Sequence, residues 1–128
     1  MDPVSGISLG RIAIGVSALA APTTTAKLFG LDPAANPHLG YFARMFGTRE
    51  IALGTVTLVS RGALRRNLTL VGIAVDGADA ATGVLELNAR NVPKPAGAML
   101  VGAALGAVGS GISALVRNRG ARAAQTVE

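Results

Sequence analysis

The chain has 128 residues; 50% are hydrophobic, a further 17 are glycine, and only 15% are charged. These figures exclude an intrinsically disordered chain and leave too few polar side chains to coat a water-soluble enzyme. The net charge of +5 first suggests nucleic acid, but the basic residues lie in short clusters between apolar segments and only 3% of residues are aromatic. This distribution is typical of a membrane protein, so we expect membrane lipid and no nucleic acid as a partner.

Four apolar segments follow one another along the chain, at residues 4–21, 39–60, 64–87 and 95–116. Each is about 18–24 residues long, which lets a helix cross a hydrocarbon core about 30 Å thick. Pro22 ends the first segment, and Pro37 and Pro95 lie at or near the start of the second and fourth. The pattern predicts an all-α, four-helix transmembrane bundle. Residues 1–116 would form a single four-span membrane domain, and residues 117–128 a polar, frayed cytoplasmic tail.

The connection after the first segment contains a short helical pattern. It begins with the N-cap-type residues Thr23 to Thr25 and ends in the C-cap-type Gly30, which predicts a short interfacial helix between spans one and two. The small-x-small sequence at residues 18–20 leaves a cleaved signal peptide as an alternative for the first segment. We favour an uncleaved span, because the preceding region carries Asp2 and no cluster of positive charge.

The basic residues predict the orientation. With four spans, both termini share one side with the second connection, and seven arginines lie at or near that side against three basic residues on the other. The seven are Arg11, Arg61, Arg65, Arg66, Arg117, Arg119 and Arg122, and the three are Lys27, Arg90 and Lys94. The positive-inside rule then places the chain in the inner (plasma) membrane with both termini cytoplasmic. The arginines either fix topology alone, which we favour, or also bind anionic headgroups.

Six charged residues lie inside the expected spans and away from their ends, and the formal charges of these six cancel. They are Arg11, Arg44, Arg49, Glu50, Asp76 and Asp79. A charge at the bilayer centre costs about 2.5–3.5 kcal/mol on insertion scales, so six of them cannot face lipid, and we predict an interior ion-pair network. Arg49 and Asp79 each lie nine residues in from the same outer face, which places them at one depth. Arg44 and Glu86 share a shallower depth.

The role of this network stays open between two interpretations. It is either a structural cluster that fixes the register of the second and third spans, or a polar cavity that binds a polar headgroup, an ion or a proton. Two carboxylates one turn apart, Asp76 and Asp79, could share a proton. We expect no metal or cofactor, because His38 is the only histidine and the chain has no cysteine.

The fourth segment carries a stripe of small residues at every fourth position, formed by Ala98, Gly102, Gly106 and Ser110. Such stripes permit close helix contacts. The Gly102/Gly106 stripe therefore either packs within the bundle or contacts a second copy or a partner membrane subunit.

The second and third segments together resemble a group of small four-helix integral membrane proteins of unknown function from actinobacteria. The second opens with Arg44-Met45-Phe46-Gly47-Thr48-Arg49-Glu50, which matches an Arg-x-x-Gly-x-Arg-(Asp/Glu) signature, and the third carries the aspartate pair Asp76 and Asp79. Pro22 and Phe29-Gly30 also match, and the resemblance covers about residues 5–115. It implies a four-span fold and brings no activity, substrate or cofactor with it.

Three functions remain after these observations. The favoured one is a non-enzymatic ligand-binding or transporter-like bundle, or an accessory subunit of a larger complex. The first alternative is a small membrane enzyme acting on a lipid or isoprenoid-like substrate, with Asp76, Asp79 or Glu50 as general acid or base. The second is a soluble helical bundle with an unusually apolar surface.

Overall fold

The structure, a computed structural model, describes residues 1–127, which form five helices and contain no strand. The helices are α1 (Pro3–Ala20), α2 (Pro22–Leu28), α3 (Leu39–Val59), α4 (Gly62–Asn88) and α5 (Lys94–Gln125). The prediction of an all-α chain is confirmed. The short helix expected between the first two apolar segments is α2.

The ends of the first two helices follow from local sequence. Asp2 caps α1, because its carboxylate accepts the backbone N–H of Ser5 at 3.1 Å. α2 starts at Pro22 without a side-chain cap, so the predicted start at the threonines is wrong. The predicted glycine end is confirmed: Gly30 adopts a φ of +78° and donates its N–H to the carbonyl of Lys27 at 2.9 Å.

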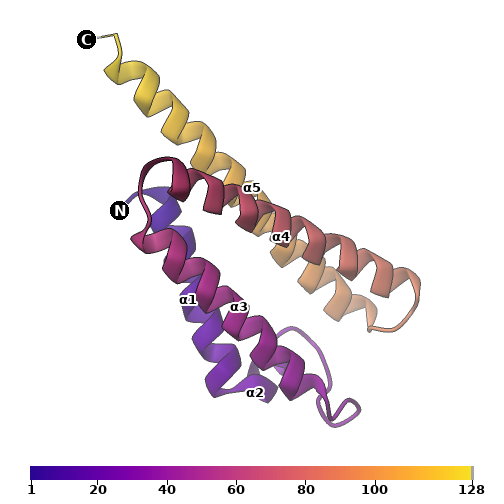
Figure 1. Ribbon diagram of the computed structural model, residues 1–128. Helices are drawn as coiled ribbons and strands as arrows, with labels where there is room; N and C mark the ends of the chain where they lie inside the picture. Colours follow the sequence, from indigo (N-terminus) through magenta and orange to yellow (C-terminus); the bar gives the residue numbers. More distant parts are fainter. Residues whose placement is uncertain (128) are drawn as a thin grey trace.

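The helices form two pairs (Figure 1). α1 lies along α3, with α2 beside them, and α4 lies along α5. The pairs approach each other at the end that carries the N-terminus and diverge towards the other end. The connection from α3 to α4 is only two residues long, Ser60 and Arg61, so it holds the two pairs together at the narrow end.

Small residues bring α1 and α3 into backbone contact. A Cβ added to Gly15 would lie 2.7 Å from the carbonyl oxygen of Gly47, and one added to Gly54 would lie 2.6 Å from the carbonyl oxygen of Ser8. No side chain fits at these distances, so the close approach requires glycine. Contacts of this type are common where helices pack within a membrane.

The distribution of polar and apolar residues is inverted relative to that of a soluble protein. The buried hydrophobic residues are small: Val4, Ala18, Ala26, Ala80, Ala96 and Ala114. Among the described residues, seven are buried and polar or charged: Ser8, Thr25, Glu50, Thr57, Ser60, Thr69 and Asp76. Large apolar side chains such as Leu70, Val84, Leu105 and Ile112 are exposed along the helices. Because a soluble protein buries its large apolar side chains, this surface is suited to lipid.

Three helices, α1, α4 and α5, are long and apolar enough to cross a membrane. α3 falls short of the same standard, because every stretch of 18 residues within it contains Arg44, Arg49 and Glu50. Apolarity therefore identifies three of the four expected spans, and the case for the fourth depends on how the charges of α3 are compensated.

The end of the chain differs from expectation. α5 continues to Gln125, so residues 117–125 extend the helix and the prediction of a frayed tail is wrong for them. Residue 128 lies outside the described residues. The polar tail thus projects beyond the other helices as a continuation of α5 (Figure 1).

Candidate functional site: a charged cluster shared by three helices

Five of the six charged residues expected in the network lie together. They form a charged cluster of Arg11 from α1, Arg49 and Glu50 from α3, and Asp76 and Asp79 from α4. The cluster therefore links the two helix pairs at a point away from their short connection. Its members lie away from the helix ends, at positions that would be at the depth of the hydrocarbon core if the helices span a membrane.

Arg11 is the centre of the more buried half. Its Nη1 donates to Glu50 Oε2 at 2.8 Å and to Asp76 Oδ1 at 3.1 Å, and its Nη2 donates to Asp76 Oδ2 at 2.5 Å. The side chains of Arg11, Glu50 and Asp76 are only 12%, 6% and 7% exposed. The bidentate contact with Asp76 is the geometry in which arginine binds carboxylate most strongly. One guanidinium thus holds two buried carboxylates.

Two glycines, Gly54 of α3 and Gly72 of α4, make room for the side chain of Arg11. A Cβ added to Gly72 would lie 2.9 Å from Arg11 Nη2, and one added to Gly54 would lie 3.2 Å from Arg11 Cβ. Gly72 is one helical turn before Asp76, so the same face of α4 supplies both the space and the counter-charge. This face of α4 is therefore occupied by the side chain of Arg11 from α1.

Arg49 and Asp79 form the more open half. Arg49 Nη1 donates to Asp79 Oδ1 at 3.2 Å and Nη2 donates to Asp79 Oδ2 at 2.5 Å, so the expected pair is present. The guanidinium also lies 5.2 Å from the centre of the Phe46 ring. However, the side chains of Arg49 and Asp79 remain 38% and 35% exposed. No other side chain in residues 1–127 covers this pair completely.

The two halves meet where Arg49 and Glu50 face each other. Arg49 Nε lies 3.6 Å from Glu50 Oε1, close enough for an ion pair. Both atoms are buried and have no hydrogen-bond partner among the described residues. The cluster contains two guanidinium groups and three carboxylates, which leaves a formal charge of −1. Neutrality therefore requires a proton, a cation or a cationic group from elsewhere.

The space around the buried half is small. A cavity of about 20 Å³ is lined by residues of α1, α3, α4 and α5, including Ser8, Arg11, Thr57 and Asp76. A cavity needs about 10–15 Å³ to hold one water molecule, so this one has room for a single water. Small-molecule sites usually occupy about 300–1,000 Å³. The buried half therefore has the properties of a packed ion-pair cluster.

Arg44 lies outside the cluster, which corrects the expected membership of the network. It is exposed, and its Nε donates to the backbone carbonyl of Leu19 at 3.4 Å. Glu86, expected at the same depth, accepts instead from Asn91 Nδ2 at 3.0 Å. Because Arg44 is absent, the expected cancellation of charge is wrong for the cluster that forms.

The Gly102/Gly106 stripe of α5 is not used for packing within the chain. A Cβ added to Gly102 or Gly106 would meet nothing within 4 Å among the described residues. α5 packs on α4 through a different face, where Gly111 lies against Ile73. Of the two expectations for the stripe, packing within the bundle is wrong.

Sequence reasoning missed the role of Arg65, which was expected to set topology or to bind an anionic headgroup. Its Nη2 donates to Asp2 Oδ1 at 2.7 Å and to Ser5 Oγ at 2.8 Å, while Nη1 donates to the carbonyl of Leu58 at 3.2 Å. It thus ties the start of α1 to the end of α3 and binds carbonyls that the end of a helix leaves without partners. The negatively charged Asp2 at the start of the chain is the only sequence signal for this contact.

Comparison with known proteins returns no family model, no curated protein and no solved structure that matches this chain. The resemblance to small actinobacterial membrane proteins therefore stays a prediction. The function proposed below rests on the geometry and composition of the chain itself.

Proposed function

We propose that the chain is a four-span protein of the inner membrane with both termini cytoplasmic, in which α3 is the additional span. At 21 residues α3 is about 31 Å long, enough to cross a hydrocarbon core. Two of its three charges join the charged cluster, which reduces the cost of placing them in lipid. The inverted distribution of polar and apolar residues supports this proposal over a soluble bundle.

Within the membrane, the protein acts as a non-catalytic subunit that binds a partner membrane chain through the charged cluster. The observation that carries this function is the exposure of Arg49 and Asp79 at 38% and 35%. Arg49 is the middle residue of α3, so the pair lies near the bilayer centre, where charged side chains almost always face protein or water. A polar group from a partner chain would cover the pair.

The chemistry of that group follows from the cluster's charge. A formal charge of −1 favours a cationic or hydrogen-bond-donating side chain, which would approach Asp79 and compensate the excess carboxylate. The exposed Gly102/Gly106 stripe on α5 offers a second surface at which a helix could approach closely. Both features suit an accessory subunit that is completed by its complex.

The alternative of a membrane enzyme has less support. Each oxygen of Asp76 and Asp79 already accepts a hydrogen bond from an arginine, so both carboxylates are engaged in ion pairs. The third candidate, Glu50, is bound by Arg11 at 2.8 Å and keeps one oxygen without a hydrogen-bond partner among the described residues. The cavity beside Asp76 has room for one water. A lipid or isoprenoid-like substrate therefore has no enclosed site beside Asp76 among the described residues.

Assembly size at native expression level tests the proposal. A tagged chain is extracted from its own membranes in a mild detergent, and its migration is followed on native gels. We expect a complex larger than the 12.8 kDa chain. The double substitution Arg49→Leu/Asp79→Leu should release the chain from it, whereas Arg44→Leu on the same helix should not. A monomeric wild type, or equal behaviour of the two variants, contradicts the proposed function.

A further inference from the structure

A second pocket lies at the narrow end of the molecule, away from the charged cluster. Its volume is about 90 Å³, and its walls come from the start of α1, the start of α4 and the C-terminal part of α5. The lining residues are Val4, Gly62, Arg65, Arg66, Thr69, Leu115, Asn118, Arg119 and Arg122. Four of these nine residues are arginines, and none is acidic.

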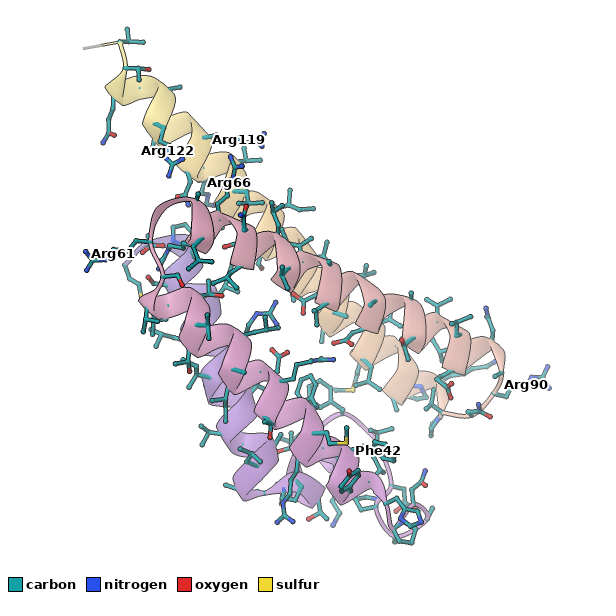
Figure 2. All side chains as sticks on the ribbon, in the orientation of Figure 1. Phe42, Arg61, Arg66, Arg90, Arg119 and Arg122 are labelled. Atoms are coloured by element: carbon teal, nitrogen blue, oxygen red, sulfur yellow. The ribbon has the colours of Figure 1, made fainter. Side chains whose placement is uncertain are left out.

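Three of the four arginines have no counter-charge in the structure. Arg65 is occupied by Asp2, Ser5 and carbonyls of α3. Arg66, Arg119 and Arg122 form no ion pair within residues 1–127. Figure 2 shows these three side chains gathered at one end of the molecule, whereas Arg61 points away from them. Three like charges around one pocket repel each other unless an anion lies between them.

The start of α4 adds to the positive potential. Gly62, its first residue, lines the pocket, and no side chain caps this end of the 27-residue helix. The first backbone N–H groups of a helix lack intrahelical partners and carry a partial positive charge. Two independent elements, the arginines and an uncapped helix start, therefore direct positive charge at the same space.

We propose that this pocket binds a phosphate-type anion, supplied either by the headgroup of an anionic phospholipid or by free phosphate. Guanidinium groups bind phosphate oxygens in a bidentate manner, and three of them suit a group that presents several oxygens. A volume of about 90 Å³ holds several water molecules, which such a group would displace. Val4 and Leu115 give the pocket an apolar wall that suits the glycerol end of a lipid.

Binding to the purified full-length chain tests the proposal. Delipidated protein in a neutral detergent at 0.15 M salt is titrated with phosphatidylglycerol, with phosphatidylcholine and, separately, with inorganic phosphate. Native mass spectrometry reports bound lipid, and the shift in the unfolding temperature reports either ligand. The pocket variant is Arg119→Gln/Arg122→Gln. The matched control, Arg61→Gln/Arg117→Gln, removes the same amount of charge from two residues that do not line the pocket.

We expect the pocket variant to weaken binding by about twenty-five-fold, since it removes two arginines and each arginine near a bound anionic headgroup contributes about fivefold. The control should change it by less than about threefold, because outlying charges are screened at this salt concentration. Preferential binding of phosphatidylglycerol identifies a lipid as the source, and binding of inorganic phosphate with the same sensitivity identifies a soluble one. Equal losses in both variants, or no binding of either probe to wild type, overturn the proposal. Unchanged helicity and unfolding temperature without ligand verify that each variant folds.

Discussion

Replacing Arg11 tests whether the charged cluster holds the fold together. Arg11→Met keeps a side chain of similar length and removes the guanidinium that binds Glu50 and Asp76. The substitution deletes three hydrogen bonds, at 2.8, 3.1 and 2.5 Å, and leaves two carboxylates facing each other with side chains only 6% and 7% exposed. Breaking a buried ion pair by removing one partner costs about 3–5 kcal/mol, and we expect a loss of this size.

Because the cluster carries excess negative charge, we expect Glu50→Gln, which alters the same contact, to cost less stability than Arg11→Met. Glu50→Gln retains an oxygen that can accept from Arg11 and reduces the formal charge of the cluster from −1 to zero. We expect it to cost less than about 1.5 kcal/mol, the net value of one ordinary hydrogen bond. In a cluster that was neutral to begin with, either substitution would create an imbalance, so the costs of Glu50→Gln and Arg11→Met would be closer together.

Unfolding by sodium dodecyl sulfate in mixed micelles, followed by far-ultraviolet circular dichroism, provides the free energies. Arg44→Met is the matched control, because Arg44 is exposed and makes a single hydrogen bond at 3.4 Å, so its loss should cost about 0.5 kcal/mol or less. A cost of Arg11→Met no greater than that of Arg44→Met would contradict a stabilising role of the charged cluster. A cost of Glu50→Gln equal to that of Arg11→Met would contradict the excess negative charge.

Three further predictions follow from other contacts. Gly54→Ala should lower the free energy of unfolding by about 1–3 kcal/mol, because the added Cβ would lie 2.6 Å from the carbonyl oxygen of Ser8. Gly102→Ala, whose Cβ would meet nothing within 4 Å among the described residues, should cause no loss in the same assay. Equal effects of the two substitutions would contradict the close α1–α3 contact at Gly54. The hydrogen bonds from Ser5 and Arg65 lower the pKa of the Asp2 carboxyl below its ordinary value of 3.8. The ionised carboxylate therefore stabilises the fold above that pH, and this stabilisation is lost as the pH falls. The difference in unfolding temperature between wild type and Asp2→Asn should shrink below pH 3.8, and a constant difference would refute this role. Since the chain has no cysteine, single cysteines can report topology: a membrane-impermeant maleimide should label Asn36→Cys in intact spheroplasts but Ala63→Cys only after permeabilisation, and identical labelling would show that α3 does not span.

The sequence predicted the elements and one ion pair well because both depend on distances along a helix. Counting nine residues from a shared face was enough to bring Arg49 and Asp79 to one depth. The membership of the cluster was predicted less well, because it depends on the angle around the helix. Arg44 precedes Arg49 by five residues, which turns it by about 140° at 3.6 residues per turn. It therefore points away from the face that carries Arg49.

The packing of the helix pairs could not be derived from residue patterns in the same way. The small residues of α5 occur on more than one face, so the sequence gives no reason to choose the face with Gly111 over that with Gly102. The choice depends on which large side chains of α4, such as Ile73, find a glycine opposite. Likewise, Arg65 reaches its partners only because the turn between α3 and α4 is short.

The excess charge of the cluster and the exposure of its Arg49–Asp79 half can both be compensated by one kind of contact. The cluster carries one negative charge in excess, and its Arg49–Asp79 half is more than one-third exposed. A proton or small cation would correct the charge but leave the pair uncovered, and lipid tails would cover the pair but leave the charge. A donor side chain on a partner helix corrects both at once, because it brings a counter-charge and its surrounding apolar surface together. The half-open pair therefore supports the proposed interface with a partner chain.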